Sequence, residues 1–232
     1  MPKKSAKRLW LAAIRRRRKE TWSIAFPIFL VATVHGVHAL NYEGKIKFKR
    51  AISEVLSSSA ELRFKTDGDG MVYRHFDIGA QIQPLESWRF ATHFRAVDKK
   101  PNDRHWLREE RLYFQAEKLI PSTKSMPLKL FVLRIRNRLE SRWRENKEQA
   151  YRYRLRFKVK AKRKLFGRLT PFISNDFYYD LQQHEYNINR FDIGVDLGRF
   201  RKLEHSLYVK FKSKRKDSHW ATEASLVYKL DI

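Results

Sequence analysis

A strict two-residue alternation between apolar and basic side chains constrains this chain more than any other feature. It is clearest from Ala150 to Lys162, where Tyr, Leu, Phe, Val or Ala occupies every second position and Arg or Lys stands between them. On a helix these two sets would be spread around the whole circumference, whereas on a strand they fall on opposite faces. The segment is therefore predicted to be a β-strand with one apolar and one cationic face.

The same period recurs along most of the chain. Turn-like or charged links separate the alternating segments, for example Thr66 to Gly70 and Lys99 to Asp103. No motif repeats every 20–50 residues, which argues against a propeller or solenoid. The pattern predicts about ten strands joined as successive hairpins, of which nine accompany the first: 60–65, 75–82, 88–96, 109–117, 133–140, 169–180, 192–198, 207–212 and 220–232.

These strands are predicted to form a membrane barrel rather than a soluble sandwich. They are long enough for a tilted crossing of the hydrocarbon layer, and their polar faces are heavily charged, as suits a watery lumen. Lipid offers no hydrogen-bond partners to the backbone, so a sheet persists there only when it is closed. We expect an all-β, antiparallel up-and-down transmembrane β-barrel of about 10–12 strands over residues 57–232.

The first 39 residues resemble an export signal. A strongly basic stretch is followed by a short apolar run interrupted by Pro27, and Val37 and Ala39 fit the small-residue positions before a signal-peptidase cut. Cleavage is expected after Ala39. An uncleaved anchor is the alternative. Residues 40–56 are left open as an extension of the first strand, a short extra strand or a plug.

Export also explains part of the net charge of +26. Nine of the 51 Lys and Arg residues lie in the first 39 positions. The others lie mostly on the polar faces of the predicted strands, and two adjacent strands carry a cationic lumen face: Arg134, Arg136, Arg138, Arg152, Arg154, Arg156, Lys158 and Lys160. Such crowding needs compensation, for which the predicted acidic partners are Glu109, Glu140, Asp176, Asp180, Asp192 and Asp196.

This arrangement allows two interpretations of the lumen. In the first, salt bridges fill and brace a small barrel, since about ten strands is close to the size that side chains fill. In the second, the cations attract and bind, or pass, an anionic solute. A soluble periplasmic barrel or sandwich that binds an anionic lipid or polymer is a further alternative.

Catalytic, metal and nucleic-acid functions are less well supported by the residues. The chain has no cysteine, no G-x-S-x-G motif and no paired-histidine metal spacing. A membrane-embedded lipid hydrolase remains the enzymatic alternative, but we expect no catalytic role and no cofactor. Nucleic acid is not expected, because the aromatic and cationic residues lie on opposite faces, whereas binding a base and its phosphate requires one surface.

Four segments in order resemble a bacterial family catalogued as domain of unknown function 2490, whose members are regarded as outer-membrane β-barrels. The segments are LRIRNRLE from Leu133, YRYRLR from Tyr151, PFISNDFY from Pro171 and NRFDIG from Asn189. Order and spacing match over roughly residues 57–232. The resemblance implies fold and location and no particular activity.

The expected setting is the outer membrane of a Gram-negative bacterium. The partners expected there are membrane lipid, the barrel-assembly machinery and an anionic solute. The assembly machinery would read the last strand, which ends in the alternating residues Tyr228, Leu230 and Ile232. A monomer is expected.

Overall fold

A computed structural model describes most of the chain after the predicted leader. The described residues are 40–68, 70–100, 105–121, 130–145, 147–200, 203–216 and 219–232. The predicted signal peptide and its cleavage position at Ala39 lie outside them. No helix among the described residues is long and apolar enough to cross a membrane.

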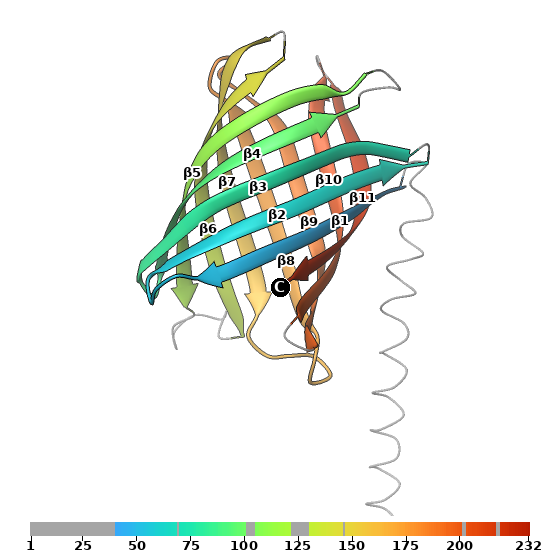
Figure 1. Cartoon of the computed structure of the whole chain (residues 1–232). Helices are drawn as coiled ribbons and strands as arrows, with labels where there is room; N and C mark the ends of the chain where they lie inside the picture. Colours follow the sequence, from blue (N-terminus) through green and yellow to red (C-terminus); the bar gives the residue numbers. More distant parts are fainter. Residues whose placement is uncertain are drawn as a thin grey trace, which may run out of the picture. The chain divides into compact units, whose positions relative to one another are not determined.

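The described residues form eleven strands that close into one barrel (Figure 1). All ten segments predicted from the alternation are strands, and an eleventh precedes them. In chain order they are β1 (Leu40–Ala51), β2 (Leu56–Asp67), β3 (Gly70–Leu85), β4 (Trp88–Lys99), β5 (Leu107–Pro121), β6 (Phe131–Arg144), β7 (Lys147–Ala161), β8 (Thr170–Asp180), β9 (Glu185–Phe200), β10 (Leu203–Lys216) and β11 (His219–Asp231).

The eleventh strand settles the segment before residue 57. Leu40–Ala51 is β1, a wall strand paired with β2 from Tyr42↔Thr66 to Ala51↔Ser57. The segment is therefore a strand of its own and not a plug, so the barrel begins at Leu40 rather than at residue 57. The expected count of about 10–12 strands agrees with the eleven observed.

An odd number of strands changes how the barrel closes. Consecutive strands pair antiparallel, as expected. At the closure, however, β1 and β11 run in the same direction. Ile232 N donates to Lys47 O over 2.8 Å and Ile232 O accepts from Lys49 N over 3.1 Å, so one residue bonds to both neighbours of Phe48, which is the parallel pattern. The fully antiparallel prediction is wrong at this one pairing.

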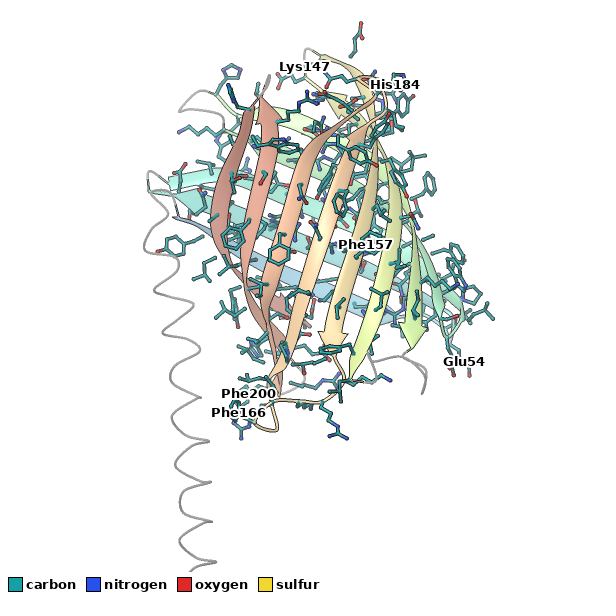
Figure 2. The ribbon with its side chains drawn as sticks, turned by 180° about the vertical axis from the view of Figure 1, so that it is seen from behind. Glu54, Lys147, Phe157, Phe166, His184 and Phe200 are labelled. Carbon is teal, nitrogen blue, oxygen red and sulfur yellow. The ribbon has the colours of Figure 1, made fainter. Side chains whose placement is uncertain are left out.

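The two ends of the barrel are named here after the chain ends that they carry. The N-terminal rim holds the start of β1 and the turns after β2, β4, β6, β8 and β10, whereas the C-terminal rim holds the other turns and the end of β11. In Figure 2, Lys147 and His184 mark the N-terminal rim at the top, and Glu54, Phe166 and Phe200 mark the C-terminal rim at the bottom.

The wall has an apolar outside and a polar inside, as the alternation predicts. On β3, Ile78 is outside and 50% exposed, whereas its neighbour Asp77 is inside and 3% exposed. The pattern repeats around the barrel, where exposed Phe and Leu side chains alternate with buried Arg, Glu, Asp and His. A soluble globular protein shows the reverse pattern. The interior nevertheless contains one small apolar cluster of Phe172, Tyr208 and Val227.

Candidate functional site

All eight predicted cations lie on the inner face of β6 and β7. The register pairs Arg134 with Lys158, Arg136 with Arg156 and Arg138 with Arg154, while Arg152 lies opposite Glu140. Side chains directly across an antiparallel pair are about 5 Å apart. The two strands therefore form a continuous basic wall inside the barrel.

Asp176 on β8 is the central counter-charge of this wall. It is 0% exposed, and its carboxylate accepts from Arg154 Nη2 over 2.7 Å and from Arg156 Nε over 2.5 Å. Arg190 on β9 approaches the same carboxylate to 3.7 Å. One predicted acidic partner thus compensates three guanidinium groups from the two strands on either side of it.

Two further predicted acids also pair with the basic wall. Glu140 lies 3.3 Å from Arg138 Nη1, and Asp196 lies 2.5 Å from Lys160 Nζ. Arg152, in contrast, has no ion pair among the described residues, and its guanidinium lies 5.5 Å from the centre of the Tyr178 ring. Three of the six predicted acids, counting Asp176, therefore pair with cations of the basic wall.

The remaining three predicted acids have other partners. Glu109 binds Lys99, Arg111 and Arg142 at 2.5–2.6 Å. Asp192 binds Arg190 and accepts from Ser174 Oγ over 3.2 Å. Asp180 accepts from the backbone N of Gln182 over 3.1 Å and therefore holds the turn after β8. The structure contradicts the expectation that these acids pair with the eight cations, because among the described residues none of the three forms an ion pair with any of them.

The acid that pairs with Arg134 and Arg136 is Glu117, which the alternation also places on the polar face of its predicted strand. Glu117 on β5 lies 2.6 Å from Arg136, 3.6 Å from Arg89 and 3.9 Å from Arg134. The alternation identifies Glu117 as inward-facing, but only the β5–β6 register, which sets Glu117 opposite Arg136, makes it a partner.

Other inner ion pairs involve residues that are neither in the predicted cationic lumen face nor among its predicted acidic partners. Asp77 on β3 receives Arg95 Nε and Tyr113 O–H over 2.7 and 2.6 Å and contacts His93 over 2.7 Å. Glu43 on β1 pairs with Lys210 and Arg63. Glu43 lies within residues 40–56, for which the sequence allowed several structures.

Inside the wall lies a basic cavity of about 730 Å³. Its lining contains seventeen Lys or Arg residues and only seven Asp or Glu residues. Seven of the eight predicted cations line it, and Arg152 does not. The excess of positive charge means that the ion pairs described above do not neutralise the cavity.

The cavity occupies only one half of the barrel. Its lining reaches the C-terminal rim at Lys49, Lys164 and Arg199. Towards the N-terminal rim buried side chains narrow the described interior, among them Glu109, Glu140, Arg142, Lys210 and Ser225. The space is therefore a vestibule that is entered from the C-terminal rim.

Several cavity cations have no direct ion pair. Among the described residues, no carboxylate forms an ion pair with Lys47 or Lys49 on β1, or with Lys158 on β7. Lys158 Nζ lies 3.9 Å from the centre of the Phe172 ring, while its neighbour Lys160 is paired with Asp196. The carboxylates of Glu61 and Asp231 attract the charge of Lys47 without forming an ion pair with it, while Lys229 and Arg136 repel it. These ammonium groups are available to an anion.

Metal and catalytic chemistry have little support in the part of the chain that the structure describes. No group of three or more metal-binding side chains is assembled there. The buried His93 and His75 are held by Asp77 and Glu61, over 2.7 and 3.1 Å. These contacts brace the wall, and the expected absence of an enzyme and a cofactor stays a prediction.

Three solved structures are similar to the barrel. A KdgM porin is 10% identical, with 75% of this chain and 89% of that chain covered and a TM-score of 0.42. A NanC porin is 9% identical, with coverages of 76% and 86% and a TM-score of 0.42. The translocator domain of the autotransporter NalP from Neisseria meningitidis is 7% identical, with coverages of 90% and 95% and a TM-score of 0.39.

The amino-acid sequence gives a firmer assignment. A search of the curated proteins found no match. The model of the family described as "Protein of unknown function (DUF2490)" matches residues 39–222, which include β1 to β10 and the basic wall on β6 and β7. The chain therefore belongs to the DUF2490 family, as the strand motifs in its sequence indicated.

Proposed function

We propose that this protein is an outer-membrane β-barrel that binds an anionic solute in its basic vestibule. The observation that carries the proposal is the set of unpaired lysines, Lys47, Lys49 and Lys158, in a cavity that reaches one rim. Rings of Lys and Arg in a confined space raise the local concentration of anions. Binding is favoured over passage because buried side chains narrow the other half of the lumen.

Placement in a membrane rests on the outer surface of the wall. The strands contain 11 to 16 residues, which is enough for a tilted crossing of the hydrocarbon layer. Exposed Tyr and Trp side chains occur near the N-terminal rim, where the headgroups of a membrane would lie. They are Tyr42, Trp143, Tyr151, Tyr186 and Trp220.

Location in the outer membrane follows from the predicted export signal together with this surface. An exported chain without long apolar helices passes the inner membrane and folds as a barrel in the outer one. As part of the same proposal, the assembly machinery recognises β11, the barrel is a monomer, and the protein catalyses no reaction.

The anion site is tested with pyranine, a fluorescent trianion, and the barrel folded in an uncharged detergent. We expect binding that weakens with salt, because charge is the main attraction. In Lys47→Gln/Lys158→Gln, the dissociation constant measured by fluorescence anisotropy is expected to rise about tenfold. Lys118→Gln/Lys147→Gln removes the same charge outside the cavity lining and should change the constant by less than about twofold.

Two results would contradict the anion site. If folded wild type does not bind pyranine, then the charged residues only brace the wall. If both double variants lose affinity equally, the probe responds to net charge and not to the vestibule.

Planar-bilayer recording separates binding from passage. Because buried side chains narrow the N-terminal half of the lumen, we expect no steady conductance from the wild-type barrel. A steady, anion-selective conductance would show that the lumen is open and would replace binding with passage.

A further inference from the structure

The loop between β7 and β8, residues 162–169, has a composition unlike its surroundings. Its sequence, KRKLFGRL, contains four cations and three large apolar residues, and no acidic residue lies anywhere between Glu148 and Asp176. At its tip Phe166 is 57% exposed, and Leu165 is exposed beside it. The loop thus presents apolar and cationic side chains together at the C-terminal rim.

Backbone hydrogen bonds close this loop into a tight turn. Leu165 N donates to Leu169 O over 2.6 Å, Leu169 N donates to Leu165 O over 2.9 Å, and Arg168 N donates to Leu165 O over 3.2 Å. Phe166 and Gly167, the two central residues, have φ values of +51° and +73°. Two positive φ angles are typical of a tight hairpin turn, and a bulky residue rarely adopts one. The turn therefore exposes the Phe166 side chain to the surroundings, although its positive φ is unfavourable for a bulky residue.

The end of β9 adds a second aromatic side chain to the same place. The β8–β9 register starts with Thr170↔Asp196, so the end of β9 extends past the start of β8 towards this loop. A Cβ added to Gly198 would lie 3.3 Å from Arg168 O, so the loop runs directly along β9. Phe200 is 65% exposed, and Figure 2 shows Phe166 and Phe200 at the same corner of the C-terminal rim.

We infer that this apolar tip and the basic loop behind it form a binding site for phosphate-bearing lipid headgroups at the surface of the membrane. Aromatic side chains enter the region between headgroups and acyl chains, and nearby Arg and Lys residues bind the phosphates. Both chemistries are present on one hydrogen-bonded turn and the neighbouring end of β9, whereas a small soluble anion would not require the exposed Phe166 and Phe200. The inference rests on the membrane placement proposed above and does not depend on the vestibule.

The test measures which lipids stay bound to the full barrel, folded in detergent, by native mass spectrometry. The probes are phosphatidylglycerol and phosphatidylcholine with identical acyl chains. Wild type is expected to retain phosphatidylglycerol about tenfold better, and Arg163→Gln/Arg168→Gln is expected to lose most of that preference. Phe166→Ser is expected to lower retention of both lipids severalfold, because the acyl contact is removed.

The matched control is Arg108→Gln/Lys147→Gln, which removes two exposed cations at the N-terminal rim and should keep the preference. The inference is overturned if wild type retains both lipids equally, or if the control loses as much preference as Arg163→Gln/Arg168→Gln. Displacement of the lipid by glycerol 1-phosphate together with no effect of Phe166→Ser would make the loop a site for a soluble anion instead. Heat-shifted gel mobility in every sample shows that the barrel is folded, so a negative result here leaves the proposed membrane placement intact.

Discussion

Replacing Asp176 with alanine is expected to destabilise the folded barrel by about 3–5 kcal/mol. The carboxylate is fully buried and receives Arg154 and Arg156, with Arg190 nearby. Its removal leaves three guanidinium groups in the interior without their common counter-ion, and losing one partner of a buried ion pair costs far more than losing an exposed one. The free energy of unfolding is measured by urea titration of the detergent-folded protein, followed by tryptophan fluorescence.

Asp98→Ala is the matched control for this prediction. Asp98 accepts from Arg74 over 2.8 Å, but both side chains are substantially exposed to solvent. The expected loss is below about 1 kcal/mol. A change of less than about 1 kcal/mol in Asp176→Ala as well would mean that water in the lumen solvates the guanidinium groups, and the central role of Asp176 would be wrong.

Gly194→Ala is expected to prevent the pairing of β9 with β10. Gly194 lies opposite Tyr208 in that register, and an added Cβ would overlap the Cβ and Cα of Tyr208 and the backbone oxygen of Leu207. Backbone atoms of a paired strand cannot move aside without breaking the ladder, so the cost should exceed about 3 kcal/mol, the upper range of ordinary overpacking. Loss of the heat-shifted gel band reports the failure of the barrel to close.

Gly68→Ala provides the comparison for the glycine variant. A Cβ at Gly68, in the turn after β2, meets no atom within 4 Å. We expect this variant to fold like wild type. If Gly194→Ala also keeps the heat-shifted band, the β9–β10 register described here is incorrect.

The strands and their two faces could be predicted from the sequence because each strand meets lipid on one face and the aqueous lumen on the other. Where apolar residues such as Phe157 alternate with basic residues such as Lys158, the two-residue period is visible without any knowledge of the neighbouring strands. On β1 the same alternation is present, with Tyr42, Ile46 and Phe48 outside, but Gly44 interrupts the apolar set. Gly44 leaves room for the ring of Phe64 on β2, a contact between strands that no single segment reveals.

The pairing of charges was less predictable than their orientation. Alternation fixes which way Asp176, Glu117 and Asp180 point, whereas the register between strands and the demands of a turn decide their partners. Asp176 lies beside the basic wall, Glu117 reaches it from β5, and Asp180 is bound by the backbone of Gln182 and Gln183. The vestibule depends on how side chains from all strands pack in the interior. It therefore cannot be predicted from the pattern of each strand taken alone.

The central claim, a barrel with lipid outside and a hydrated basic vestibule inside, is tested most directly by cysteine labelling on β7. The chain contains no cysteine, so Phe157→Cys and Lys158→Cys each introduce a single thiol. Phe157 lies on the outer face of the wall (Figure 2), whereas Lys158 lines the vestibule. In membranes of cells that produce the protein, a water-soluble maleimide is predicted to label Lys158→Cys and to leave Phe157→Cys unlabelled until urea unfolds the barrel. Equal labelling of the two thiols in the folded protein, or recovery of the protein in the soluble fraction, would contradict the account.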